Sequence, residues 1–325
     1  MSEPTTVQQT IGRMLDNAGA ILLGCHVNPD GDAIGSILGL GHVLRRRGKQ
    51  VCLVCPSPVP AKFTFLPGHQ EVMQELPDWD PDLIAILDCG DRQRLAYLND
   101  DSLFERFPSV NIDHHATNDH FATVNWVDPS MAATTEMLAA LLAEMHWPLD
   151  ETVATCLLTG LHTDSLGFRT PTTRPRTLRL AADLMAAGAS MTSIVTQIYD
   201  SKSRATLRIW GLALAAVQEE GPLVWTAITR DMLVRAGAEN ESLGGIVGFM
   251  RNTADVEVAV LFSESSDGRI RTEFRSRGRV NVAEIARQLG GGGHPPAAGC
   301  SLPGPLEEAE RTVLAEVRQA LAVSK

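Results

Sequence analysis

The chain has 325 residues, of which 44% are hydrophobic and only 5% aromatic, and its formal net charge is −11. This length exceeds what one typical domain needs, and the hydrophobic fraction supports a sizeable core. The acidic balance argues against a protein that tracks long DNA or RNA, because phosphate contacts need a surplus of Lys and Arg. It does not exclude a small phosphorylated ligand held by a few local cations or by metal ions.

No apolar run is long enough to span a bilayer, and the N-terminus lacks a basic start followed by an apolar stretch. We therefore expect a cytoplasmic protein with no membrane partner. Cys52 and Cys55 form a C-x-x-C, but the surrounding QVCLVC is typical of a buried strand, in which residues three apart face opposite sides. No second cysteine pair follows, so we do not expect a zinc or redox site there.

Apolar strands alternate with helical stretches in the first half of the chain. Strands are expected at 21–26, 50–55, 83–88 and 109–113. Helices are expected at 33–47, 132–145 and 151–162. This alternation predicts an α/β fold, with a mostly parallel sheet flanked by helices, in a domain over residues 1–189.

A helical, partly charged stretch over residues 190–220 is expected to be a linker that could act as a hinge. Beyond it, strands are expected at 223–228, 256–262 and 270–276, and helices at 282–289 and 306–322. They predict a second, smaller α/β domain over residues 221–325, with a glycine tract at 290–293.

Acidic and histidine side chains gather where the strands of the first half end. Ligands of an open parallel sheet bind at this edge. Asp30 and Asp32 could simply cap the helix that follows them. Asp88 and Asp113 end hydrophobic strands, where a carboxylate is costly unless it is paired or bound to metal. Carboxylates with imidazoles and no thiolates suit Mn²⁺, Fe²⁺ or Zn²⁺, whereas an all-oxygen set suits Mg²⁺ better.

Five motifs carry a family resemblance. They are His26-Val-Asn-Pro-Asp30-Gly-Asp32, the D-x-x-D of Asp88 and Asp91, Asp113-His114-His115, Thr163-Asp164, and the late GGGGHPPAAG that begins at Gly290. In this order, and over nearly the whole chain, they resemble the DHH phosphoesterases that carry a C-terminal DHHA1 domain. The fourth motif departs from many members, which place a glycine nearer the aspartate.

The resemblance implies two divalent cations, with Mn²⁺ as the expected ion and Mg²⁺, Fe²⁺ or Co²⁺ as alternatives. One would be held by His26, Asp30 and Asp88. The other would be held by Asp32, His114 and Asp164, with Asp88 bridging. Such a pair suits a phosphoryl hydrolase.

Three further residues of these motifs have implied roles at the reaction centre. Asp113 and Asp91 would hold the ligands in place. His115 would orient the phosphate or assist proton transfer; the alternative is a core histidine with satisfied hydrogen bonds.

The resemblance places the substrate contacts in the second domain. They are Arg251, Arg275, Ser276, Gly291, Gly292, Gly293 and His294. Glycines let backbone N–H groups approach a phosphate closely. The alternative for the glycine tract is a tight turn between a helix and a strand, although four glycines are more than a turn needs.

A short, acidic chain of two domains is most similar to the branch of bifunctional oligoribonucleases (nanoRNases) and 3′-phosphoadenosine 5′-phosphate (pAp) phosphatases. That resemblance implies a short RNA or small nucleotide substrate, and it allows a homodimer. Alternatives are a cyclic di-AMP or pApA phosphodiesterase, a RecJ-like single-strand exonuclease, and a nucleotide sensor without catalysis. The exonuclease predicts a basic channel with stacking aromatics, and no such groove is evident.

Overall fold

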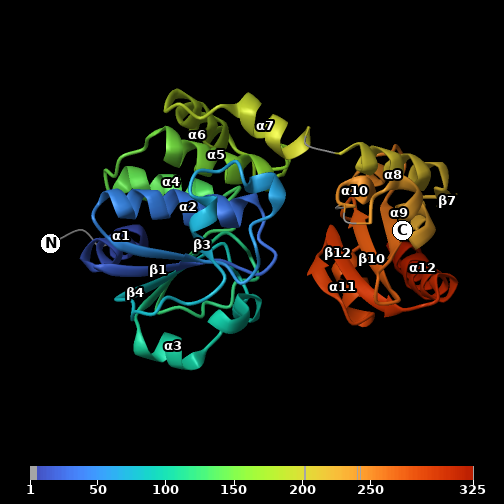
Figure 1. Ribbon diagram of the computed structural model, residues 1–325, viewed down its shortest axis with the longest axis horizontal. Coiled ribbons are helices and arrows are strands. Elements are labelled where there is room, and N and C mark those ends of the chain that lie inside the picture. The colour runs from blue at the N-terminus through green and yellow to red at the C-terminus, as the bar shows by residue number, and fades with distance from the viewer. Residues whose placement is uncertain (1–5, 201–202, 240, 242, 325) are drawn as a thin grey trace. The chain divides into compact units, whose positions relative to one another are not determined.

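The computed structural model describes residues 6–200, 203–239, 241 and 243–324. The chain divides into two compact units, Met1–Ser201 and Lys202–Lys325 (Figure 1). Each unit has its own six-stranded sheet and its own hydrophobic core.

Six parallel strands form the sheet of the first unit, in the order β3-β2-β1-β4-β5-β6. They are β1 (Ala20–Gly24), β2 (Gln50–Val54), β3 (Val72–Met73), β4 (Leu83–Leu87), β5 (Ser109–Asp113) and β6 (Val124–Val127). The predicted parallel α/β fold is confirmed. The two edge strands are additional to the expected ones: β3 has only two residues, and β6 buries only Trp126, so neither produces a clear pattern.

Helices cover both faces of this sheet. The larger core lies under α1 (Val7–Asn17), α2 (Gly31–Arg46), α4 (Thr134–Glu144) and α5 (Glu151–Asp164). A smaller core on the other face is closed by the 3-10 helix Arg92–Leu98 and by α3 (Asp101–Arg106) (Figure 1). Cys52 belongs to the smaller core and Cys55 to the larger one, as expected for strand residues three apart.

Two further helices, α6 (Pro175–Ala186) and α7 (Met191–Tyr199), complete the first unit. No single helix in the described part of the chain is long and apolar enough to cross a bilayer. Helices α6 and α7 pass that test only as a pair, by length and composition, and they meet at a bend of 103°.

Glycines set the distance between α2 and α5. A Cβ atom on Gly35 would lie 2.5 Å from the backbone oxygen of Cys156, and one on Gly39 would lie 3.0 Å from Leu157. Gly31, one turn before Gly35, would meet Thr163 in the same way. The absence of side chains at these positions lets the two helices approach closely, which draws the start of α2 toward the end of α5.

The second unit has a mixed sheet in the order β11-β12-β10-β9-β8-β7, in which only β8 and β9 pair in parallel. The strands are β7 (Gln218–Glu220), β8 (Leu223–Ile228), β9 (Val258–Glu264), β10 (Arg269–Ser276), β11 (Gly292–His294) and β12 (Ala297–Pro303). On one face lie α11 (Val282–Gln288) and α12 (Leu306–Val323). On the other lie α8 (Arg204–Ala215), α9 (Arg230–Ala236) and α10 (Ile246–Arg251).

The stretch expected to be a linker is divided between the units. Helix α7 belongs to the first unit, whereas α8 and β7 belong to the second and contribute to its core or its sheet. The end of the glycine tract is extended, because Gly292 and Gly293 form strand β11 beside β12.

Candidate metal centre

The polar residues of the first unit converge at the carboxyl ends of β1, β4 and β5, next to the start of α2 and the end of α5. Two groups of three residues bring their ligand atoms within 4.8 Å of one another. The first group is His26, Asp30 and Asp88, and the second is Asp32, His114 and Asp164. These are the two sets that the motifs predict.

In the first group, the Nε2 atom of His26 faces Asp88 Oδ2 at 3.6 Å. The other ring nitrogen lies 2.8 Å from the backbone oxygen of Val27. Asp30 caps α2, because its Oδ1 accepts hydrogen bonds from the backbone of Asp32 and Ala33. The capping interpretation of Asp30 is therefore correct, and Oδ2 remains for a cation.

In the second group, His114 Nε2 lies 3.3 Å from Asp164 Oδ2 and 4.0 Å from Asp32 Oδ2. The same nitrogen lies 3.7 Å from Asp88 Oδ1. Asp88 therefore presents one oxygen to each group, as a bridging carboxylate would. The Nδ1 of His114 lies 3.4 Å from the backbone oxygen of Met131, a carbonyl that can fix the ring as in known metal-binding histidines.

Burial and mutual repulsion make these carboxylates electrostatically unfavourable without a cation. Asp32 and Asp88 are 0% and 1% exposed. Burial, and then the charges of Asp32 and Asp30, raises the pKa of Asp88 well above its usual value. The same causes raise the pKa of Asp164 to about 8, and burial raises that of Asp32. Oxygen and imidazole donors in such a cluster fit divalent cations, which would offset the repulsion.

The start of α4 supports this cluster through residues that we did not single out from the sequence. Asp32 accepts hydrogen bonds from the backbone N–H groups of Thr134 and Thr135 and from the Thr135 hydroxyl. The Thr134 hydroxyl donates to Asp88 Oδ1 at 3.1 Å. Ala133 at the N-cap offers no side-chain acceptor, which is the signal that this helix needs a cap from elsewhere in the chain.

His115 is held by Asp113. Its Nδ1 lies 2.7 Å from Asp113 Oδ1, while the other Asp113 oxygen accepts a hydrogen bond of 2.6 Å from Asn118. Burial favours a raised pKa for Asp113, but these hydrogen bonds and the His115 charge outweigh it, and the pKa is lowered. His115 also forms a group with Asp88 and His114. The predicted supporting role of Asp113 thus has a geometric basis.

Asp91 lies apart from this arrangement. It is exposed, and its Oδ1 caps the 3-10 helix by accepting from the backbone of Gln93. None of the three residue groups includes it. Arg94 in that helix, which we did not single out, lies with its Nη2 2.8 Å from His26 Nδ1.

Comparison with known proteins identifies the family. The profile of the DHH family, N-terminal domain, matches residues 20–161, and that of the DHHA1 domain matches residues 224–323. A Thermus thermophilus protein named bifunctional oligoribonuclease and PAP phosphatase NrnA is 35% identical over 309 residues, which cover 93% of this chain and 90% of that protein. The chain belongs to the DHH family.

Other relatives of this DHH protein agree. The Bacillus subtilis protein of the same name is 30% identical and aligns over 87% of this chain and 89% of its own. An exopolyphosphatase-related protein from Bacteroides fragilis has the same fold, with a TM-score of 0.92 at 23% identity, covering 100% of this chain and 99% of that one. The chain is accordingly a hydrolase that acts on phosphoester bonds.

The loop after Asp164 shows how this DHH domain accommodates a fourth motif whose glycine lies farther from the aspartate than in many members. Leu166, Gly167 and Phe168 all have left-handed backbones, with φ of 51°, 70° and 64°. Left-handed φ favours glycine, so Leu166 adopts a conformation that a glycine would accept without strain. Asp164 nevertheless reaches the second metal group, so the departure leaves the ligand in place.

In the DHHA1 domain, the predicted substrate contacts partly converge. Arg275 on β10 pairs with Ala297 on β12, which pairs with residue 294 on β11, so these three positions lie in one row across the sheet. Arg251 ends α10, which packs on the sheet face that carries Ala259, the partner of Arg275 on β9. The side chain of His294 lies outside the described part of the structure.

Ser276 points to the opposite face from Arg275. It is 3% exposed, and its hydroxyl lies 2.7 Å from the backbone oxygen of Val280. The Ser276 hydroxyl oxygen also accepts a hydrogen bond of 3.3 Å from the backbone N–H of Gly278. The Ser276 side chain thus holds the turn after β10, and it offers no surface for a substrate.

The four glycines of the tract have different reasons to be glycine. Gly290 and Gly293 have φ of 76° and 143°. A Cβ on Gly291 would meet the backbone of Gly299, and one on Gly293 would lie 2.5 Å from the Cα of Ala298. Gly292 has neither constraint, because a Cβ there would point into open space. The fold therefore favours glycine at three of these positions and sets no such requirement at Gly292.

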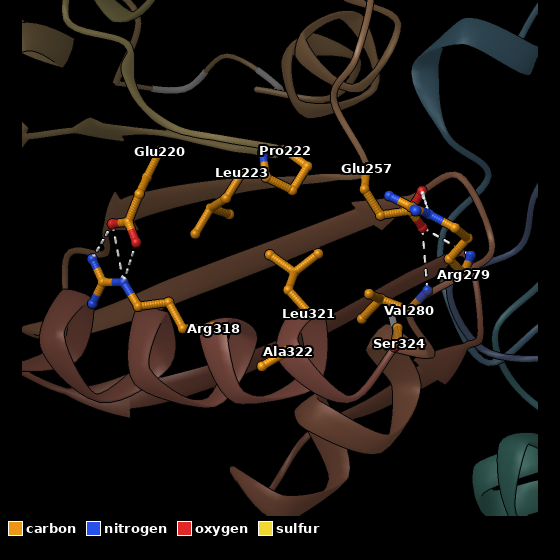
Figure 2. Close-up of a pocket in the computed structure, with 10 residues that line it drawn as sticks. All are labelled: Glu220, Pro222, Leu223, Glu257, Arg279, Val280, Arg318, Leu321, Ala322 and Ser324. Carbon is orange, nitrogen blue, oxygen red and sulfur yellow. Dashed lines mark hydrogen bonds and ion pairs between the residues drawn. The ribbon is translucent and has the colours of Figure 1, made fainter.

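A cavity of about 320 Å³ lies elsewhere in the DHHA1 domain, between α12 and the sheet. Figure 2 shows an apolar floor that includes Leu223 and Leu321 between two ion pairs, Glu220–Arg318 and Glu257–Arg279. None of the predicted substrate residues with described side chains lines it.

Proposed function

We propose that this protein hydrolyses short oligoribonucleotides to nucleoside monophosphates and removes the 3′-phosphate of pAp to give AMP, with two Mn²⁺ ions. The observation that carries the proposal is the Asp88 carboxylate, which offers Oδ2 to the His26 group and Oδ1 to the His114 group. The names of the Thermus and Bacillus relatives support the choice of substrates.

The residues of the two groups would hold the ions as predicted, with Asp88 between them. Bound divalent cations supply charge stabilisation at the phosphate and activation of water at neutral pH. The backbone N–H groups at the start of α4 fix Asp32, so that this ligand is in place before the ion arrives.

His115 is the candidate for proton transfer. Its Nδ1 donates to Asp113, which fixes the tautomer and orients Nε2 away from that carboxylate. A histidine held in this way can donate a hydrogen bond to a phosphate oxygen or a proton to the leaving oxygen. Asp113 would stabilise the imidazolium form.

The DHHA1 domain would bind the part of the substrate that does not react. Arg275, Arg251 and the backbone of Gly292 supply donors suited to a phosphate. The open space around Gly292 supports this assignment, because a ligand can approach its backbone there. Ser276 has no part in it.

A turnover panel in Mn²⁺ tests the proposal, with pAp, a dinucleotide, a five-nucleotide RNA, a long single strand, cyclic di-AMP and pyrophosphate as substrates. We expect monophosphate release from the first three and little from the long strand. Asp88→Asn, purified in the same way, is the control: loss of activity in it shows that the hydrolysis comes from this centre and not from a contaminant. Preferential cleavage of the long strand or of cyclic di-AMP would reject the proposal, as would inertness on every substrate.

A further inference from the structure

The Nδ1 atom of His26 has two neighbours that compete for it. The backbone oxygen of Val27 and the Nη2 of Arg94 both lie 2.8 Å away. A carbonyl oxygen only accepts hydrogen bonds, and a guanidinium only donates them. Nδ1 can therefore satisfy one neighbour at a time: it donates to Val27 when it carries the hydrogen, and it accepts from Arg94 when it does not.

A metal on Nε2 decides between the two. An imidazole that binds a cation through Nε2 carries its hydrogen on Nδ1, and that hydrogen then points to Val27. The Arg94 N–H would meet another N–H at this position, so the guanidinium has to turn away from His26. Occupation of the first metal group thus frees the donors of Arg94.

The backbone keeps Arg94 beside the centre whichever way its side chain turns. The N–H of Val27 donates to the backbone oxygen of Arg94 at 2.8 Å, and Arg94 N–H donates to Asp91. Leu95 and Leu98 anchor the same 3-10 helix in the smaller core. The arginine is only partly buried, so a released guanidinium can reach a ligand at the surface of the centre.

Charge indicates what that ligand is. The carboxylates of Asp30, Asp32, Asp88 and Asp164 balance two divalent cations, so an incoming phosphate adds negative charge that the ligand set does not offset. A guanidinium binds phosphate oxygens through two parallel N–H groups, which suits it to that task.

We propose that Arg94 is a phosphate-binding residue of the metal centre, which leaves His26 when the first metal group is filled and then binds a non-bridging oxygen of the scissile phosphate. This inference rests on the proposed phosphoesterase function, and it makes a prediction that a structural role would not. A hydrogen bond from Arg94 favours the His26 tautomer with its hydrogen on Nε2, whereas a metal on Nε2 needs the hydrogen on Nδ1. Removal of Arg94 should therefore strengthen or preserve metal binding and weaken phosphate binding.

The experiment uses the full chain stripped of metal with EDTA and the variants Arg94→Met and Arg94→Lys. Arg106→Met is the matched control, because Arg106 is exposed and pairs with Asp80 on the surface. Calorimetric titration with Mn²⁺ alone measures the metal, and titration of the Mn²⁺-loaded protein with inorganic phosphate measures the anion. Steady-state hydrolysis of pAp is the third measurement, and circular dichroism confirms folding.

We expect Arg94→Met to bind Mn²⁺ at least as tightly as the wild type, and to lose about 10- to 100-fold in phosphate affinity and in kcat/KM, as for a lost charged hydrogen bond. Arg94→Lys should recover part of that loss, and Arg106→Met should match the wild type. Weaker Mn²⁺ binding in Arg94→Met, by the same factor as the activity, would show that Arg94 only supports His26 and would overturn the inference. Unchanged phosphate affinity would overturn it as well.

The two titrations need no turnover. If the wild type fails to hydrolyse any nucleotide but Arg94→Met still loses phosphate affinity, the proposed substrates are wrong and the role of Arg94 stands. If the wild type hydrolyses pAp and Arg94→Met does so equally well, the proposed function stands and the role of Arg94 is wrong.

Discussion

Asp113 holds His115 through a contact of 2.7 Å between Oδ1 and Nδ1, and Asn118 secures the other oxygen of the same carboxylate. This pairing fixes the tautomer of His115 beside Asp88, from which its Nδ1 is 3.8 Å away, as the proposed role in proton transfer requires.

Replacement of Asp113 by Asn should lower kcat about 10- to 100-fold, as is usual for the loss of a group that orients a reactive histidine. Mn²⁺ affinity should change much less, because neither metal group contains Asp113. Steady-state kinetics on pAp with a parallel Mn²⁺ titration measure both. Asn118→Ala is the milder comparison, since it removes the hydrogen bond to Asp113 Oδ2 and those to Asn111 and Cys89 but keeps the contact between Asp113 and His115. Equal kcat values in the two variants would contradict the role of Asp113.

Asp88→Asn should bind fewer Mn²⁺ ions per chain than the wild type and should lose turnover, because the amide cannot bridge two cations. In the metal-free state the same variant should unfold at a higher temperature than the wild type. The reason is that it removes one of several buried like charges. Ion stoichiometry by elemental analysis and thermal unfolding in EDTA provide the two measurements, and full occupancy by two ions in Asp88→Asn would refute the bridging role.

The metal-free protein should become less stable as the pH rises from about 4 to about 8. The pKa of Asp164 is raised to about 8 in the folded state, and those of Asp88 and Asp32 are also raised. A raised carboxyl pKa means that the folded chain binds more protons than the unfolded chain in this window, so stability falls with pH. Melting temperatures at pH 5.5 and 8 in EDTA measure the slope, and Asp164→Asn should reduce it. Added Mn²⁺ should restore stability at pH 8; a melting temperature that rises with pH in EDTA would disprove the electrostatic account.

Gly292→Ala and Gly293→Ala form a matched pair on one strand. A Cβ at Gly292 meets open space, whereas one at Gly293 meets the backbone of Ala298, and φ there is 143°. We expect Gly292→Ala to keep the melting temperature and to raise KM for pAp, and Gly293→Ala to destabilise the DHHA1 domain. An unchanged KM in Gly292→Ala would show that this glycine does not contact the substrate.

Gly35→Ala should destabilise the protein by about 1–3 kcal/mol, because the added methyl would press on the Cys156 carbonyl and overpack the contact between α2 and α5. Gly211→Ala in α8 is the control, since nothing lies near its Cβ and alanine favours a helix by about 1 kcal/mol. Chemical denaturation with and without Mn²⁺ measures both. Equal stability of the two variants would contradict the close-packing account.

The sequence was sufficient for the parallel sheet, which depends on local pattern, and the family motifs were sufficient to select the residues that the structure gathers in the two candidate metal groups. Each ligand follows a strand or lies at a helix end, and parallel strands bring those ends to one edge. Thr134 and Thr135 could not be found in this way, because their role depends on Asp32, about a hundred residues away in the chain. Arg94 was missed for the same reason, since its importance lies in the distance to His26.

Other features escaped because short elements leave weak patterns. Strand β3 has two residues, and β11 is built largely of glycine, which disfavours strands in general. Ser276 was assigned to the substrate by its place in a motif, but alternation along β10 turns it into the core while Arg275 faces the other side. Asp91 ends a motif in the sequence, yet its carboxylate caps a 3-10 helix at the surface.

The glycine contact between α2 and α5 has a consequence for substrate choice. Asp30 and Asp32 lie at the start of α2 and Asp164 at the end of α5, which is the same end of this helix pair, so the close packing of the two helices sets the distances between these carboxylates. A centre of this kind cannot stretch to suit a larger reacting group. For the proposed substrates, we therefore expect discrimination between a nucleotide with one terminal phosphate and a chain of several nucleotides to come from how far the unreacted portion extends.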